Sequence, residues 1–234
     1  MSRQFTLKLS RTRRPSFVNF IEKGNDKALV ATQRLVTEPV ANAIYLWGKA
    51  CGKTHLLLAA TNAAAEAGLQ AIYLSMRDQA SLDTRMLADL EEYDLVCIDD
   101  IERIARDAAW EEALFHLYNR VRERDGRLLI ASDCSLAQLP VELPDLHSRL
   151  AWGASYQLLP LDDEGKRQLL LQIADEKGMA MNGDAADYLL RRYSRDVHEL
   201  VALMEKLDRR SLAAKQKLTI PFLRQSLSMI SDAG

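Results

Sequence analysis

The stretch that decides the fold of this chain is Trp47-Gly48-Lys49-Ala50-Cys51-Gly52-Lys53-Thr54. The apolar run AIYLW at 43–47, which is typical of a buried parallel strand, leads into it. Residues 53–67, which begin at its end, have the apolar spacing of a helix. A loop in this setting that ends in Gly-Lys-Thr indicates a Walker A phosphate loop. Backbone amides and the helix N-terminus would face phosphate oxygens, Lys53 would neutralise the outer phosphates, and Thr54 would offer its hydroxyl to magnesium.

The loop departs from the motif in its spacing. The motif places four residues between its glycines, whereas Gly48 and Gly52 enclose three. With Gly52 kept in register, Trp47 stands where the first glycine is expected, so the sequence predicts a tight loop. The alternative is an ordinary glycine-rich turn before a helix, and a second motif argues against it.

That second motif is the acidic strand end Leu95-Val96-Cys97-Ile98-Asp99-Asp100. Four apolar residues followed by two carboxylates have the form of a Walker B strand. Asp99 would hold magnesium through water, and Asp100 stands where a water-activating residue would lie, although a glutamate is commoner there in efficient ATPases. The alternative is a strand that ends in a solvated turn, since aspartate is a routine turn residue.

Strand and helix patterns alternate around these motifs and predict an α/β fold with a parallel five-stranded sheet. Further strands are expected at 70–75, 94–98, 127–131 and 156–159, with a helix that is capped by Asn25 or Asp26 and runs to about 36, and helices at 83–92 and 108–124. After Pro160 only helices are expected, at 162–177, 184–194, 197–210 and 220–229. We therefore expect a tail at 1–14, an α/β nucleotide-binding core at 15–160 and a small all-helical lid at 161–234.

Composition narrows the class of protein. With 31 Lys and Arg against 33 Asp and Glu, the net charge of −2 gives no overall electrostatic footprint for nucleic acid. The cysteines Cys51, Cys97 and Cys134 are odd in number and form no CxxC, which favours reduced thiols over disulfides or zinc. No run of eighteen apolar residues exists, so we expect no membrane span and a cytoplasmic location.

Short segments spread along nearly the whole chain match the sequence pattern of a known family. They are Phe17-Val18-Asn19-Phe20, Tyr45-Leu46-Trp47, Lys53-Thr54-His55-Leu56, Ile98-Asp99-Asp100, Trp110-Glu111-Glu112-Ala113, Leu117-Tyr118-Asn119-Arg120, Leu143-Pro144-Asp145-Leu146-His147-Ser148-Arg149-Leu150 and Lys217-Leu218-Thr219-Ile220-Pro221-Phe222. In them the chain resembles the DnaA-like branch of the AAA+ proteins, and within it the short members that regulate the bacterial replication initiator DnaA. The resemblance implies an AAA+ P-loop core with a helical lid, ADP or ATP as cofactor with magnesium, and assembly into a homo-oligomer.

The resemblance gives roles to two residues beyond the loop. Asp133 matches the sensor 1 position, where a polar group would detect the γ-phosphate. The alternative is a helix N-cap, because Ser132-Asp133 after a strand is also a capping signal. Arg149 matches the arginine finger that enters a neighbour's nucleotide site and stabilises charge in trans. The alternative there is a surface arginine on a short helix.

The lid departs from the family pattern. Aligning Arg195-Asp196-Val197-His198-Glu199-Leu200 places His198 where a sensor 2 arginine is expected. An unperturbed histidine is mostly neutral at pH 7, so it is a weaker phosphate partner, and Arg195 is the alternative. Together with the tight loop and Asp100, this departure implies feeble hydrolysis at the protein's own site and a diphosphate as the resident ligand.

The tail Gln4-Phe5-Thr6-Leu7-Lys8-Leu9 resembles the peptides that dock on the bacterial sliding clamp, the β subunit of DNA polymerase III. An extended peptide points alternate side chains into one groove, so Leu7 and Leu9, with Phe5, would fill its apolar subsite, and the amide of Gln4 would anchor one end. Two alternatives are a disordered basic tail and an organellar transit peptide. The period of two in the apolar residues argues against the amphipathic helix of the transit peptide.

These features predict a regulator that docks on the DNA-loaded clamp and presents Arg149 to ATP bound by DnaA. DNA would be reached indirectly through the clamp, and no membrane would be involved. One alternative is an initiator or helicase loader, for which we would expect a further DNA-binding or partner-binding domain. The other is a self-contained P-loop ATPase, for which we would expect turnover by the isolated protein.

Overall fold

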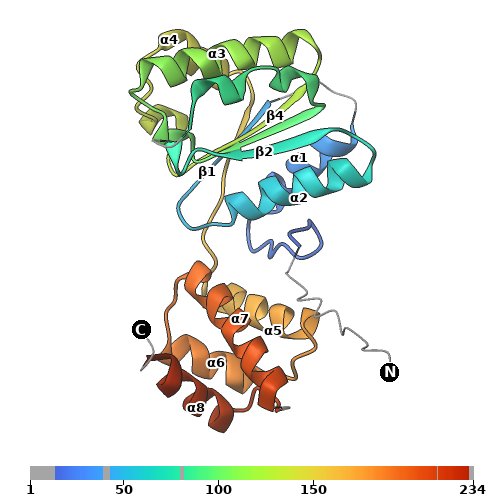
Figure 1. Ribbon diagram of the computed structural model, residues 1–234, viewed down its shortest axis with the longest axis vertical. Helices are drawn as coiled ribbons and strands as arrows, with labels where there is room; N and C mark the ends of the chain where they lie inside the picture. The colour runs from blue at the N-terminus through green and yellow to red at the C-terminus, as the bar shows by residue number, and fades with distance from the viewer. Residues whose placement is uncertain (1–13, 39–42, 80–81, 215, 232–234) are drawn as a thin grey trace, which may run out of the picture. The chain divides into compact units, whose positions relative to one another are not determined.

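A computed structural model describes residues 14–38, 43–79, 82–214 and 216–231 of the chain (Figure 1). The described residues fall into two compact units, one spanning Pro15–Asp162 and the other comprising the helices from Asp163 onward. The predicted clamp-docking residues Gln4, Phe5, Leu7 and Leu9 lie outside the described residues. None of the described helices is both long enough and apolar enough to cross a membrane.

The first unit is built on a five-stranded, all-parallel sheet, as the sequence predicts. Its strands are β1 (Ala43–Trp47), β2 (Ala71–Ser75), β3 (Leu95–Asp99), β4 (Arg127–Ser132) and β5 (Ala154–Gln157). They lie in the order β2-β3-β4-β1-β5. The carboxyl ends of β1, β3 and β4 therefore meet at the middle of one sheet edge, where ligands bind in open α/β folds.

Helices cover both faces of this sheet (Figure 1). The helices α1 (Asp26–Thr37) and α2 (Lys53–Glu66) pack on one face, and α3 (Ala108–Glu123) and α4 (Pro144–Leu150) pack on the other. Side chains of a strand alternate between the two cores: Ile44 and Leu46 of β1 join α1 and α2, whereas Tyr45 joins α3 and α4. Burial on both faces explains why the three central strands β1, β3 and β4 contain continuous apolar runs.

Three sequence predictions differ from the structure. The helix expected at 83–92 is two 3₁₀ turns, η2 (Thr84–Leu87) and η3 (Leu90–Glu92), because Asp89 between them adopts a left-handed conformation with φ 61°. The last strand begins at Ala154 rather than at 156 and ends at Gln157. Asn25 precedes α1 but makes no cap, since its side-chain amide instead pairs with both backbone groups of Leu159 (3.0 and 2.7 Å).

The second unit contains four helices within its described residues: α5 (Asp163–Glu176), α6 (Gly183–Arg192), α7 (Val197–Ala214) and α8 (Ile220–Ser231). Its core is aliphatic, with fully buried side chains such as Leu170, Leu189, Leu203 and Leu223. A mostly buried ion pair of 3.1 Å joins Lys177 to Asp208. Met181 and Leu218 form an isolated β-bridge, which the helical spacing of the sequence does not predict.

Glu111, in the first turn of α3, fixes the chain that leads into α4. The residue is 1% exposed, and its carboxylate accepts hydrogen bonds from the backbone amides of Arg106 (2.7 Å), Glu142 (3.0 Å) and Leu143 (2.7 Å). A buried carboxylate is tolerated when it is satisfied in this way.

Replacing Glu111 by Ala is therefore expected to lower the free energy of unfolding by about 3 kcal/mol, since three part-buried hydrogen bonds from backbone amides lose their acceptor. Urea unfolding measures this loss. The adjacent Glu112, which is exposed and pairs only with His116 one turn away, is the matched control, and its Ala variant should change stability by less than about 0.5 kcal/mol. Equal stabilities for the two variants would contradict this role of Glu111.

Candidate nucleotide site

The loop between β1 and α2 has the backbone geometry of a phosphate cradle. Gly48 has φ 142° and Gly52 has φ 88°, and a Cβ on Gly48 would lie 2.3 Å from the carbonyl oxygen of Leu158. Both positions therefore require glycine. Ala50 between them also adopts a positive φ of 48°. Gly52 stands at the N-cap of α2 without a side-chain cap, which leaves the first amides of the helix for a ligand.

The position of Trp47 explains how the spacing of the motif is accommodated. Trp47 is the last residue of β1, where it pairs with Ser132 on one side and Gln157 on the other. It lies in a regular strand, so the first glycine of the motif is not required there. The five residues Gly48–Gly52 alone form the turn into α2.

Lys53 lies at the centre of the site and is 7% exposed. Its ammonium donates to the carbonyl of Gly48 and, at 2.7 Å, to Oδ1 of Asp133. Burial alone would lower the pKa of Lys53, but the hydrogen bond that Lys53 donates to Asp133 and the nearby charges outweigh it and raise the pKa. The side chain is thus a permanent cation beside the loop.

Asp133 does not cap a helix. The 3₁₀ turn that follows, η5 (Leu136–Gln138), has Ser135 at its N-cap position. The carboxylate of Asp133 instead pairs with Lys53, and its backbone amide donates to Glu102 Oε2 (3.2 Å), which also accepts from the Ser132 hydroxyl (2.9 Å). The capping alternative for Asp133 is therefore wrong, while its sensor role stays a prediction.

The two predicted magnesium ligands adjoin each other. Oγ1 of Thr54 donates to Oδ2 of Asp99 at 2.6 Å, and Asp99 is 1% exposed. The hydroxyl of Tyr73 on β2 donates to the same oxygen at 3.1 Å, and burial together with this carboxylate raises the pKa of Tyr73. The described residues contain no cluster of three or more His, Cys, Asp or Glu suited to a metal. A magnesium ion here would thus need oxygens from a nucleotide and water.

The side chain of Asp100 is held in place by residues at the end of β2 and in the turn after it. It adopts a left-handed backbone with φ 60°, and its carboxylate accepts from Ser75 Oγ (3.1 Å) and pairs with Arg77 Nε (3.5 Å). The sequence analysis did not identify Tyr73, Ser75, Arg77 or Glu102. The pairing of β2 beside β3 brings the first two to the acidic strand, and strand order is not encoded in any local motif.

The segment that precedes α1 folds back against the loop. Ser16 and Asn19 exchange side-chain-to-backbone hydrogen bonds (2.9 and 3.3 Å), and the carbonyl of Ser16 lies 3.0 Å from His55 Nε2. A Cβ on Gly52 would lie 3.1 Å from the ring of Phe20. The motif Phe17-Val18-Asn19-Phe20 therefore shapes the outer side of the phosphate loop.

Other predicted residues lie outside this cluster. Arg149 is in the last turn of α4, where its guanidinium contacts the ring of Trp152 rather than the loop. Arg195 and His198 belong to the helical unit, in which Arg195 pairs with Asp163 at 3.4 Å. Their assignment to a nucleotide stays a prediction.

Replacing Lys53 by Ala is expected to weaken ADP binding by about 10- to 100-fold, because a buried charge-assisted contact to phosphate is lost. Isothermal calorimetry measures the effect. Lys27→Ala, which removes an exposed lysine on α1, is the control and should retain wild-type affinity. An unchanged affinity in the Lys53 variant would show that this loop holds no phosphate.

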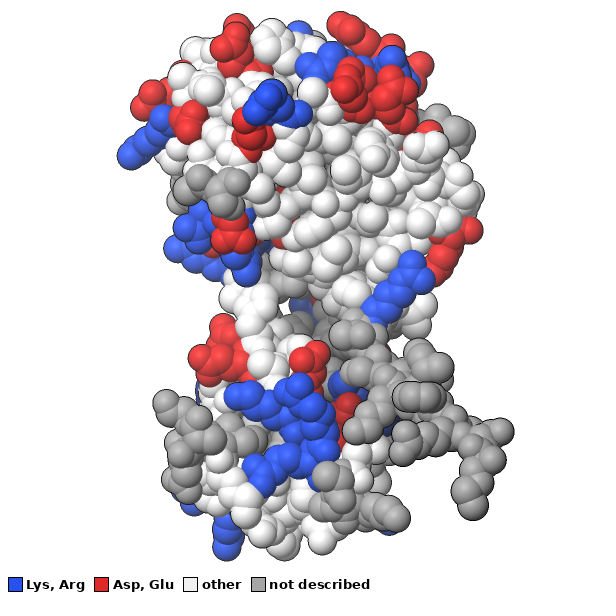
Figure 2. Space-filling model, viewed as in Figure 1, with Lys and Arg blue, Asp and Glu red and all other residues white. Residues whose placement is uncertain are grey.

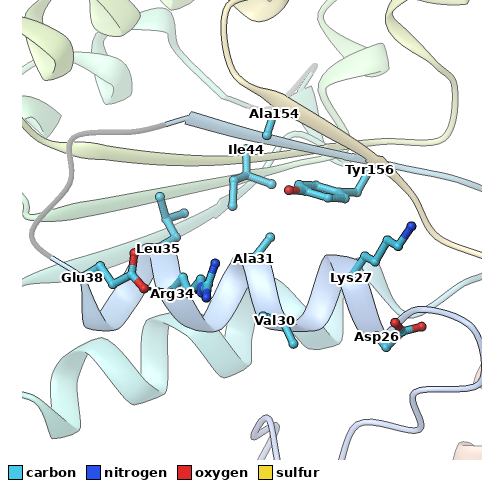
Figure 3. Close-up of a pocket in the computed structure, with 10 residues that line it drawn as sticks. All are labelled: Asp26, Lys27, Val30, Ala31, Arg34, Leu35, Glu38, Ile44, Ala154 and Tyr156. Carbon is cyan, nitrogen blue, oxygen red and sulfur yellow. Dashed lines mark ion pairs between the residues drawn. The ribbon is translucent and has the colours of Figure 1, made fainter.

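The first unit also has a pocket of about 490 Å³ between α1 and the edge strand β5 (Figure 3). Its lining combines exposed charged side chains of α1 with Ile44, Ala154 and Tyr156. None of the predicted site residues lines it. Figure 2 shows acidic and basic side chains intermingled on the visible face of this unit, in agreement with the near-neutral net charge.

The parallel sheet, the phosphate loop, the Lys53–Asp133 pair and the Thr54–Asp99 hydrogen bond define a P-loop protein of the AAA+ class. A family model described as the bacterial DnaA ATPase domain matches residues 12–157, and one described as the Hda lid domain matches residues 163–227. The chain therefore belongs to the DnaA-like AAA+ family, whose ATPase domain binds adenine nucleotides.

Individual proteins are similar to this chain in sequence or in fold. An uncharacterized protein of Haemophilus influenzae is 36% identical over 231 residues, covering 98% of this chain and all of that protein. Domain III of the Thermotoga maritima replication initiation protein DnaA has a TM-score of 0.77 at 19% identity, covering 94% of this chain and 97% of that one. AMPPCP-bound DnaA from Aquifex aeolicus has a TM-score of 0.68 at 24% identity, covering 83% and 66%.

Proposed function

We propose that this protein is a regulator of DNA replication initiation that stimulates the hydrolysis of ATP bound to DnaA. Its membership of the DnaA-like family, with a lid of the Hda kind, supports a role of the replication-initiation regulator type. Hydrolysis would convert the initiator to its ADP form and thereby inactivate it. The protein would then act on the nucleotide of a partner rather than chiefly on its own.

The observation that carries this proposal is that the guanidinium donors of Arg149 are unpaired among the described residues. Within the described residues, its guanidinium takes part in no hydrogen bond and no ion pair, although many other arginines of the core unit, such as Arg85, Arg120 and Arg124, pair with acidic side chains. An arginine that is to stabilise phosphate charge in another subunit must keep its donors available. Arg149 meets that requirement at the end of a short helix.

The protein's own site supports a structural role for nucleotide. Lys53 and the amides of the loop would hold the phosphates, and Thr54 and Asp99 would hold magnesium. Asp100, the predicted water-activating residue, is engaged by Ser75 and Arg77. We infer that hydrolysis at this site is slow, and that ADP or ATP serves to brace the core for assembly, with Asp133 and either His198 or Arg195 sensing the phosphates.

Docking on the sliding clamp completes the proposal. The tail residues Gln4, Phe5, Leu7 and Leu9 would anchor the protein on clamps loaded on DNA, so stimulation would occur only after DNA synthesis has begun. Homo-oligomer formation would follow from the same use of Arg149, because a trans-acting arginine needs an adjacent AAA+ subunit.

Reconstitution tests this function. DnaA loaded with ATP is mixed with this protein and with clamps on nicked circular DNA, and the bound ATP and ADP are separated after filtration. We expect ADP to accumulate on DnaA only when protein, clamp and DNA are all present. Accumulation at the same rate without this protein would contradict the proposal.

A further inference from the structure

Trp152 is an unusual surface residue of the first unit. Its side chain is 56% exposed, yet two arginine side chains lie over it. The Cζ atom of Arg122, on α3, is 4.0 Å from the ring centroid, and that of Arg149 is 4.3 Å from it. Phe115 is the next ring near Arg149, at 6.0 Å. Trp152 is thus the nearer aromatic platform for this guanidinium, at a distance where cation–π attraction is effective.

The contact between Arg149 and Trp152 also determines whether the N–H donors of the guanidinium stay available. Neither Arg122 nor Arg149 pairs with a carboxylate among the residues that the structure describes. A carboxylate would occupy the N–H groups along the edge of a guanidinium, whereas an aromatic ring takes only its face. Stacking on Trp152 therefore restricts the Arg149 side chain and leaves its donors unpaired.

The backbone that carries the ring is held against the core. The backbone amide of Trp152 donates to the carbonyl of Arg149 at 3.1 Å, closing the turn after α4. At the next residue, Gly153, an added Cβ would lie 2.3 Å from the carbonyl oxygen of Ala43 at the start of β1. The chain after Trp152 is thus pressed against the sheet, and Glu111 anchors the other end of α4. The backbone at Trp152 therefore cannot shift without disturbing the core.

We propose that Trp152 is the positioning residue of Arg149, holding the guanidinium in place with its donors free before a partner arrives. This inference rests on the proposed function, because it assigns Trp152 a part in the trans action of Arg149. An unrestrained arginine samples many rotamers, and ordering it beforehand reduces the entropy lost when it engages phosphate. Trp152 itself touches no reacting atom.

The test is the maximal rate of stimulated ATP hydrolysis on DnaA, measured over a range of concentrations of this protein. Trp152→Ala is expected to lower that maximal rate by about 5- to 20-fold, with the half-maximal concentration changed by less than about twofold. Trp152→Phe should recover most of the rate because its ring also attracts a cation. Trp152→Leu, which keeps apolar bulk without a π face, should not.

A double variant separates positioning from independent contact with the partner. If Trp152 acts through Arg149, then Trp152→Ala combined with Arg149→Ala should be no slower than Arg149→Ala alone. Additive losses would overturn the inference, as would a Leu variant equal to the Phe variant or a wild-type rate in Trp152→Ala. Thermal unfolding and ADP affinity, expected to match wild type, verify that the variants fold.

Failure of this inference is distinguishable from failure of the proposed function. If Arg149→Ala abolishes stimulation while Trp152→Ala does not, only the positioning role is wrong. If Arg149→Ala retains full stimulation, the assignment of Arg149 is wrong and the role of Trp152 falls with it. If the wild-type protein gives no stimulation, the proposed function itself is wrong.

Discussion

Replacing Arg149 by Ala is expected to reduce stimulated hydrolysis of DnaA-bound ATP by at least about a hundredfold, since a trans-acting arginine contributes roughly 10³ to 10⁵ in rate. Arg149→Lys should restore little of it, because an ammonium cannot reproduce the planar fork of donors. Single-turnover release of labelled phosphate from DnaA measures both rates.

Folding and docking should not change in this variant, because the Arg149 guanidinium takes part in no hydrogen bond or ion pair within the residues that the structure describes, and its aromatic contacts are with Phe115 and Trp152. The matched control is Arg85→Ala, which removes an exposed arginine paired with Asp83 in the same unit and should retain full stimulation. Persistent stimulation by Arg149→Ala would show that the arginine finger is another residue or that the mechanism does not use one.

The second large effect is expected in the tail. Changing Gln4 and Leu7 together to Ala should weaken binding to the sliding clamp by about 100-fold or more, because a buried leucine and a buried amide hydrogen bond contribute about 3 kcal/mol. Surface plasmon resonance with the full chain over immobilised clamp measures the affinity.

The control changes the two positions of the segment that carry none of the predicted contacts. Thr6→Ala with Lys8→Ala leaves Gln4, Phe5, Leu7 and Leu9 intact, so this variant should bind the clamp within about threefold of wild type. Equal weakening by the two double variants would indicate a non-specific basic tail, and undiminished binding by Gln4 and Leu7 variants would place the clamp contact elsewhere.

Local patterns in the sequence were sufficient to predict the central strands and the loop at the core of the fold. The apolar runs at 43–47 and 94–98 predicted buried strands, and β1 and β3 lie there within one residue. The Gly-Lys-Thr and Asp-Asp motifs predicted that Thr54 and Asp99 would lie close together, and their oxygens are 2.6 Å apart. Such motifs succeed because their chemistry requires fixed residue types at fixed places in the fold.

Features that depend on strand order or on single backbone angles were not predictable. The contact of Tyr73 with Asp99 requires that β2 lie beside β3, and no spacing in the sequence states that order. The predicted helix at 83–92 failed because Asp89 adopts a left-handed conformation, which aspartate tolerates but does not signal. The stacking of Trp152 with residues from α3 and α4 likewise arises only from tertiary packing.

The central claim is that the important hydrolysis takes place at the partner's nucleotide rather than at this protein's own loop. The most direct measurement loads labelled ATP in turn on DnaA and on this protein, and follows phosphate release from each in a single turnover, alone and after mixing on clamp-loaded DNA. We predict rapid release only from DnaA and only after mixing. Release from this protein alone, at the rate seen in the mixture, would contradict the account.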